Sequence, residues 1–85
     1  MMPKYRSKPV IKEAIKWDGN LTSIEHFNIP EVHQELGCDN LYIPTLEGVM
    51  RCEVGDYIVR GLKGEFYPVK SDVFELSYEL VNDDA

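Results

Sequence analysis

The sequence lacks several features that stabilise or localise small proteins. It has only two cysteines in 85 residues, Cys38 and Cys52, and they do not form a C-x-x-C pair. They are too few for a disulfide scaffold, and we expect two reduced thiols, although their spacing leaves a single bridge open. No apolar run approaches the ~18 residues that a membrane span requires, and the polar, basic start is unlike a secretory signal. We therefore expect a cytoplasmic protein that contacts no membrane.

The chain also lacks a clear catalytic or metal-binding motif. His26 and His33 are seven residues apart, and Pro30 interrupts the helix that would have to direct both rings at one metal ion. We interpret both as surface histidines. The Gly61-x-x-Gly64 motif is too short for a phosphate loop, whose lysine and hydroxyl are missing. The sequence predicts a protein that is not an enzyme and holds no cofactor or metal, although it does not exclude catalysis.

Charge is unevenly distributed along the chain. The net charge is −6, but residues 1–16 carry five basic side chains against one acidic and have a net charge of +4. The remaining residues carry four basic side chains against fourteen acidic ones, which gives −10. Such a body repels a phosphate backbone, so we expect no direct binding to nucleic acid. The basic arm is interpreted as a solvated segment that could also pair with the acidic body of a neighbouring subunit.

The length allows one domain only. We expect a flexible basic arm at 1–8, a single domain at 9–81 and an acidic tail at 82–85. A domain of this size buries only about 60–65% of the surface that its unfolded chain exposes. Small domains therefore often add disulfides, a metal or a partner subunit. Because the first two are not predicted here, we expect a homo-oligomer.

The first predicted element spans residues 10–17. Its side chains alternate well enough for a strand with Ile11, Ile15 and Trp17 on one face. Ile11, Ala14 and Ile15 also fit helical spacing, so periodicity alone leaves both open. We favour the strand because the tryptophan and two isoleucines lie on the same side just before a turn.

A short helix is predicted after that turn. Thr22 and Glu25 have the spacing of a capping box, in which both side chains bind free amide groups at a helix start. Ile24 and Phe27, three residues apart, would then face the core. Pro30 ends this helix early. The charged segment between Pro30 and the next strand is interpreted as a loop or one loose helical turn.

Short alternating runs fill the second half of the chain. Pro44 places the first of them at an edge or a bulge. In the second, Met50, Cys52 and Val54 are expected to face inward. Connections of two to four residues would join the runs into an antiparallel meander. The four predicted strands span 41–46, 49–54, 57–60 and 65–69.

The last predicted elements are a helical turn and a closing strand. Ser71 or Asp72 can cap the turn, and apolar residues then recur at every second position. The fold class is thus α+β: a small, strongly bent antiparallel sheet or partial barrel of about five short strands with one or two short helices. The residues assigned to the core face of the closing strand are Phe74, Leu76, Tyr78 and Leu80.

A long ordered signature lies in the same half. Residues 54–70 read VGDYIVRGLKGEFYPVK and are followed by DVFE at 72–75 and YE at 78–79. Together with Ala14, Ile15 and Trp17 near the start, this pattern resembles a family of small proteins encoded by tailed bacteriophages and prophages. The resemblance implies a phage accessory protein in the cytoplasm of a bacterial host. The resemblance implies no mechanism, because a mechanism has to be argued from a functional site and the family has no known activity to point to one.

A candidate ligand site can be read from the same signature. An aromatic ring beside cations can stack a base and neutralise a phosphate. For the aromatic residues a structural role in the sheet is the simpler interpretation. The candidate ligand-binding residues at one end of the meander are Arg60, Lys63, Tyr67 and Lys70. Arg51 is added because it is the only other cation of the acidic body.

Three functions are consistent with these observations. The first is a non-enzymatic counter-defence protein that sequesters a nucleotide-type host immune signal as a small homo-oligomer, whose subunit interfaces could supply a pocket. The second is an acidic protein that inhibits a host nuclease or nucleic-acid-binding factor through charge complementarity. The third is an accessory role in phage replication or particle assembly.

Overall fold

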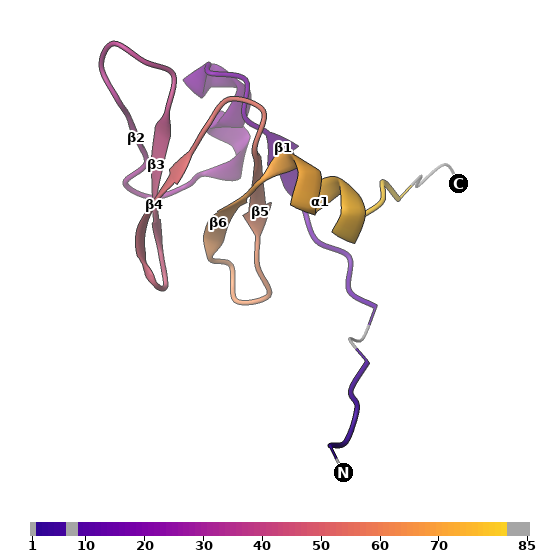
Figure 1. Ribbon diagram of the computed structural model, residues 1–85. Coiled ribbons are helices and arrows are strands. Elements are labelled where there is room, and N and C mark those ends of the chain that lie inside the picture. Colours follow the sequence, from indigo (N-terminus) through magenta and orange to yellow (C-terminus); the bar gives the residue numbers. More distant parts are fainter. Residues whose placement is uncertain (1, 7–8, 82–85) are drawn as a thin grey trace.

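The computed structural model describes residues 2–6 and 9–81. Within them the chain forms two antiparallel three-stranded sheets and two short helices (Figure 1). One sheet has the strand order β1-β5-β6 and the other β2-β3-β4. Residues 1, 7 and 8 of the expected arm and the whole of the expected tail at 82–85 lie outside the described residues. The elements are β1 (Ala14–Lys16), the 3-10 helix η1 (Leu21–Phe27), β2 (His33–Gln34), β3 (Leu41–Thr45), β4 (Gly48–Cys52), β5 (Tyr57–Arg60), β6 (Phe66–Val69) and α1 (Ser71–Ser77).

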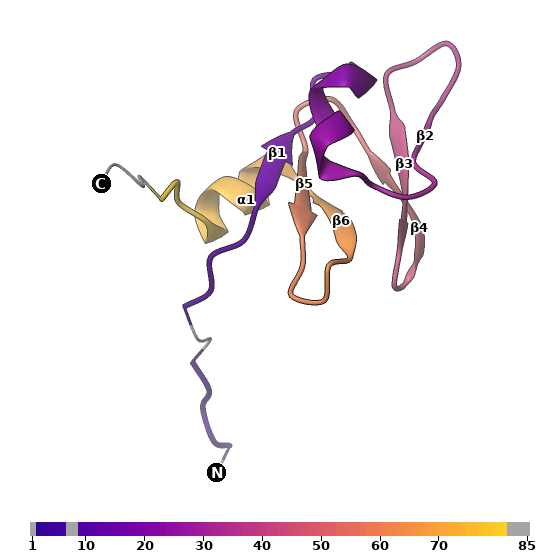
Figure 2. The ribbon, with the colours of Figure 1, turned by 180° about the vertical axis from the view of Figure 1, so that it is seen from behind.

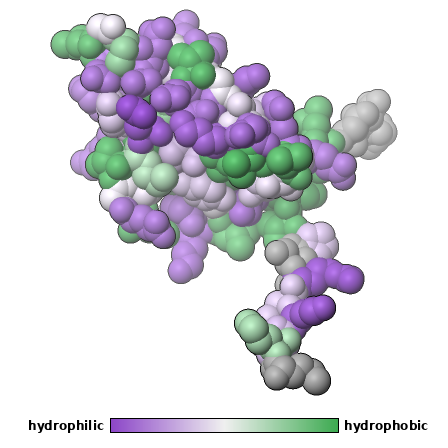
Figure 3. Space-filling model, viewed as in Figure 1, coloured by the Kyte–Doolittle hydropathy of each residue, from purple (hydrophilic) through white to green (hydrophobic). Residues whose placement is uncertain are grey.

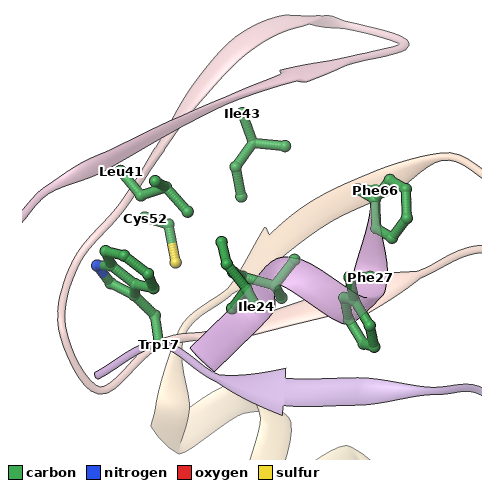
Figure 4. Close-up of a cluster of buried hydrophobic side chains, with 8 residues drawn as sticks. Trp17, Ile24, Phe27, Leu41, Ile43, Cys52 and Phe66 are labelled. Atoms are coloured by element: carbon green, nitrogen blue, oxygen red, sulfur yellow. The ribbon is translucent and has the colours of Figure 1, made fainter. Parts of the chain in front are cut away.

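The core lies between the two sheets and is completed by η1 (Figure 4). Trp17 is fully buried, and its indole Nε1 donates a hydrogen bond to the Asp39 carbonyl oxygen at 2.7 Å. Each fully buried aliphatic or aromatic side chain contributes about 1.5–3 kcal/mol relative to its exposed state. The buried cluster consists of Trp17, Ile24, Phe27, Leu41, Ile43, Cys52, Ile58 and Phe66.

The four strands predicted for the second half are present as two hairpins, β3–β4 and β5–β6. They do not form one meander, because β4 and β5 belong to different sheets. The turn between them carries the chain across: Gly55 has φ of 99°, and its N–H donates to the Trp17 carbonyl oxygen. The mixed α+β class is therefore confirmed in outline. The described residues form six strands in two open sheets, without the single bent sheet or barrel that was expected.

The inward face predicted for β4 is only partly correct. Cys52 is fully buried, but Met50 and Val54 are 40% and 51% exposed. Met50 lies toward the free end of the β3–β4 hairpin, and Val54 lies beyond the end of the strand, in the turn. Alternation along β4 therefore predicts burial correctly only for the part of the strand that the second sheet covers.

The first half begins largely as predicted. The strand is shorter than expected, since only Ala14–Lys16 pair with β5. Trp17 is buried and Ile15 half-buried, but Ile11 is 78% exposed. Ile11 precedes the paired residues, so no neighbouring strand covers it.

The capping box is wrong, although the helix is present. The N-cap is Asn20, whose side-chain oxygen accepts a hydrogen bond from the Thr22 N–H at 3.1 Å. Ile24 and Phe27 are buried, as predicted. The helix ends before Pro30, at Asn28, which adopts the left-handed conformation that asparagine tolerates well. The following segment, expected as a loop or helical turn, contains the two-residue strand β2, paired with the start of β3.

The closing strand predicted at the C-terminal end is wrong. The helix α1 extends to Ser77, and Leu76 and Leu80 are 90% and 95% exposed. Neither Ser71 nor Asp72 caps it, because the N-cap is Lys70 and forms no side-chain cap bond. Phe74 and Tyr78 fit both a two-residue and a four-residue period. Here the helical period holds, since their rings stack at 4.7 Å.

Candidate functional site

The structure does not bring the five predicted ligand-binding residues together. Arg60 pairs with Phe66 beside the turn of the β5–β6 hairpin, and Lys63 lies in that turn. Lys70 follows Val69 at the opposite end of β6. The prediction that these cations gather at one end of the sheet is therefore wrong. Arg60 and Lys63 lie at one end of the four-residue strand β6, and Lys70 lies at the other.

The side chain of Arg60 makes contacts that stabilise the fold. Its guanidinium lies over the rings of Phe27 and Phe66, at 5.1 and 5.3 Å from their centroids. It also donates to the Phe27 carbonyl oxygen at 3.2 Å and forms an ion pair with Glu13. These contacts join η1 to the β5–β6 hairpin and to the residue before β1. A phosphate would have to displace Glu13 to bind this side chain.

Lys70 and Arg51 are also paired with carboxylates. The Lys70 ammonium lies 3.2 Å from Asp56 and 3.4 Å from Glu53, and Arg51 lies 3.3 Å from Glu53. The hydrogen bond from Lys70 to Asp56 raises the lysine pKa above its ordinary value. Asp56 is nearly buried and also accepts from the Glu53 N–H at 3.0 Å. This network of charged side chains stabilises the turn between β4 and β5, so we assign it a structural role.

Tyr67 lies apart from these cations and contacts a lysine that the sequence analysis did not select. The Lys12 ammonium lies 3.2 Å from the Tyr67 hydroxyl oxygen and 3.5 Å from that of Tyr78. It also lies 5.8 and 5.9 Å from the centroids of these two rings. The hydrogen bond to Tyr67 is the main cause of a raised pKa for Lys12. This lysine is therefore held in its charged form.

Further aromatic rings continue from this lysine across the outer side of the β1-β5-β6 sheet, where α1 packs (Figures 1 and 2). Tyr57 and Phe74 stack with centroids 3.9 Å apart and an angle of 11° between their planes. Lys16 lies 5.8 Å from the Tyr57 centroid. We call this surface the lysine–aromatic face. Its residues are Lys12, Lys16, Tyr57, Tyr67, Phe74 and Tyr78.

The cations of this face differ from three of the four predicted ones; Lys63, like the lysines of this face, has no ion pair within the described residues. Within residues 2–6 and 9–81, neither Lys12 nor Lys16 forms an ion pair with a carboxylate, whereas Arg51, Arg60 and Lys70 do. Two lysines without paired carboxylates, next to aromatic rings, leave positive potential on one surface of an acidic protein. Such a surface can attract an anion and offer rings for stacking.

The sequence contained a signal for these two lysines. The first strand was predicted with Ile15 and Trp17 on its inner face, which puts Lys12 and Lys16 on the outer face by alternation. The β1–β5 register confirms it for Lys16, which is paired with Tyr57. Lys12 precedes the paired residues and contacts Tyr67 on the same side. The contact with Tyr78 had no such signal, since it depends on α1 being a helix.

A second surface feature is a groove between the free ends of the two hairpins. It has a volume of about 320 Å³ and is mainly apolar, with two carboxylates among its lining residues. Leu46 is 72% exposed there. Figure 3 shows hydrophobic side chains in separate groups among hydrophilic ones on the visible side, without one broad apolar face. We call this feature the hairpin groove, and Tyr67 belongs to it as well as to the lysine–aromatic face. The groove is lined by Thr45, Leu46, Glu47 and Met50 of the β3–β4 hairpin and by Glu65, Phe66, Tyr67 and Pro68 of the β5–β6 hairpin.

The remaining reactive side chains form no cluster in the described part of the chain. There, no group of three or more histidine, cysteine or acidic side chains is arranged to hold a metal ion. Cys38 is exposed, Cys52 is buried, and both are free thiols. Burial raises the pKa of Cys52 to about 12, so this thiol is not a nucleophile at neutral pH. None of the helices described is both long and apolar enough to cross a bilayer.

Comparison of the chain with protein-family models, with curated proteins and with solved structures finds no match. The case for a function therefore rests on the surfaces described above.

Proposed function

We propose that this protein is a non-enzymatic binding module that takes up an anionic, nucleotide-type ligand at the lysine–aromatic face. The observation that carries the proposal is the placement of Lys12 and Lys16 against tyrosine rings without a paired carboxylate. The ammonium groups and tyrosine hydroxyls can bind phosphate oxygens, and a ring can stack a base. Base–aromatic stacking contributes about 1–3 kcal/mol per base, whatever the base.

The contacts of Lys12 support this role. Its ammonium group is hydrogen-bonded to two tyrosine hydroxyls, which fix it in position. A fixed ammonium loses less conformational entropy on binding than a mobile one. The ordered contacts of Lys12 therefore favour a specific site over a diffuse cationic surface.

The resemblance to small phage and prophage proteins gives the proposal a setting. In the cytoplasm of a bacterial host, such a module would act as a counter-defence protein that sequesters a nucleotide-type immune signal. A flat aromatic face on a domain of this size offers little concavity. Assembly as a small homo-oligomer would enclose the ligand between subunits.

A thermal-shift screen tests the proposal, with AMP, ADP-ribose and cyclic di-AMP as probes. Ligand at a hundred times its Kd stabilises a protein by about 2.7 kcal/mol. For a domain of this size that raises Tm by roughly 10 °C or more. We expect Lys12→Ala to abolish the shift. The matched control is Lys63→Ala, which removes one charge from an exposed turn and should keep the shift.

Two results would contradict the proposal. In the first, no probe of the three changes Tm or binds by calorimetry. In the second, a probe binds but Lys12→Ala and Lys63→Ala weaken it equally, which would show attraction to overall charge and not to the lysine–aromatic face.

A second candidate function is inhibition of a basic host protein, such as a nuclease. It is favoured by the net charge of −10 over residues 17–85 and by the carboxylates of the hairpin groove. Such binding would weaken steeply as salt rises and would ignore nucleotides. Binding of a nucleotide that is lost in Lys12→Ala would favour the first function over this one.

A further inference from the structure

The hairpin groove and the basic arm have complementary properties. The groove is an apolar hollow whose lining residues include Glu47 and Glu65. Within the described residues Glu47 forms no ion pair, and the Glu65 carboxylate accepts a hydrogen bond from the Lys63 N–H at 2.9 Å. A matching ligand would therefore carry an apolar group flanked by cations.

Residues 2–6 of this chain have that composition. Tyr5 lies between Lys4 and Arg6, and its side chain is 92% exposed. All five residues are exposed, so the segment does not pack on its own domain. Figures 1 and 2 show residues 2–6 away from the domain, on the same side of it as the turns of both hairpins.

We propose that the hairpin groove receives residues 2–6 of a second copy of this chain. Tyr5 enters the apolar hollow, and Lys4 and Arg6 lie beside Glu47 and Glu65. The hollow, at about 320 Å³, is at the small end of the range of about 300–1,000 Å³ for ligand pockets. A single aromatic side chain suits that size.

The topology favours a second copy over the arm of the same chain. The arm precedes β1, which lies at one edge of its sheet, whereas the groove lies beyond β6 at the other edge. Lys12 is also tied to Tyr67 and Tyr78 on the outer side of that sheet. Residues 2–6 of the same chain would have to turn back from the outer side of the sheet and cross its β6 edge to reach their own groove. Exchange between two copies needs no such path.

Exchange of arms between two copies also gives a closed, symmetric dimer. Each copy offers one arm and one groove, so a two-fold axis satisfies both and leaves no open end for further growth. Two arms of five residues form a small interface compared with the ~1,000 Å² or more of stable complexes. We therefore expect association in the micromolar range that weakens with salt. This inference goes beyond the proposed nucleotide site and does not depend on it.

Sedimentation velocity of the free protein over the micromolar range tests the exchange. The wild type should show a concentration-dependent dimer, and Tyr5→Ala should remain monomeric. Leu36→Ala is the matched control, because Leu36 is 96% exposed in the loop between β2 and β3, away from the groove. It should dimerise like the wild type.

A mixing experiment identifies the two partners. One variant reverses the arm with Lys4→Glu and Arg6→Glu; the other reverses the groove with Glu47→Lys and Glu65→Gln, which keeps an oxygen for the Lys63 N–H. Each variant alone should be monomeric, whereas an equimolar mixture should form a heterodimer. Only pairing of an arm with the groove of another molecule predicts this rescue.

Several outcomes would overturn the inference. A wild-type monomer at all concentrations would exclude exchange, and a dimer that persists in Tyr5→Ala would place the interface elsewhere. Two reversed variants that stay monomeric when mixed would show that the groove does not receive the arm. None of these results requires a nucleotide, so they leave the proposal for the lysine–aromatic face unaffected.

Discussion

The lysine–aromatic face and the hairpin groove differ in charge, although they share strand β6. The face holds two lysines without paired carboxylates and rings that already stack on one another. The groove is an apolar hollow with two glutamates, Glu47 and Glu65, among its lining residues. Alternation along β6 makes this possible: Phe66 lies in the core and at the groove, while Tyr67 reaches Lys12 on the outer side. An acidic protein can therefore offer opposite charges to two different ligands.

The largest expected effect comes from the inner side of β6. Phe66 is 7% exposed and packs in the core against Phe27, with ring centroids 5.7 Å apart. Phe66→Ala should lower the free energy of unfolding by about 3–5 kcal/mol, because it removes a buried ring and leaves a cavity. Urea unfolding measures this. Tyr67→Ala, the neighbouring change on the outer side, should cost clearly less; equal costs would mean that the two sides of β6 are not distinct.

A smaller effect is expected where α1 meets the outer face. Phe74→Ala removes the ring that stacks between Tyr57 and Tyr78. Aromatic pairs contribute about 0.5–1.5 kcal/mol beyond their buried area. We expect faster hydrogen exchange of the α1 amides with the sheets intact. Leu76→Ala in the same helix is the control, since Leu76 is 90% exposed; faster exchange in that variant too would show that the stack does not hold α1.

The smallest expected effect concerns the charge of Lys12. Its pKa in the folded protein is raised above 10.5, mainly by the Tyr67 hydroxyl. Its stabilising contribution is therefore complete below 10.5 and is lost as pH rises through the folded value. The Tm difference between wild type and Lys12→Met should be constant from neutral pH to about that value and shrink above it. A difference that already declines between neutral pH and 9 would contradict the raised pKa.

Much of the fold could be predicted because its signals are local. Each predicted hairpin strand in the second half is present, and Cys52 and Trp17 are buried as alternation indicated. Two features could not be read in this way. The choice between one sheet and two depends on how the turn after Val54 directs the chain. The choice between strand and helix at Phe74 depends on whether its ring meets Tyr57, which is a tertiary contact.

The candidate site was harder to predict for the same reason. Tyr67 was selected, but its cation, Lys12, is 55 residues away in sequence. Two of the predicted cations pair with carboxylates instead: Arg60 with Glu13 and Lys70 with Asp56. Which cations are neutralised by carboxylates depends on neighbours that only the folded structure reveals; within the described residues these cations are Arg51, Arg60 and Lys70. The cations that can mark an anion-binding surface are those without a paired carboxylate.

Amide chemical shifts followed by NMR during a titration with a nucleotide from the panel test the division between the two surfaces most directly. We predict saturable shifts at Lys12, Lys16 and Tyr57, with the amides of Leu46 and Glu47 in the hairpin groove unchanged. Shifts centred on the groove, or none anywhere up to millimolar nucleotide, would contradict it.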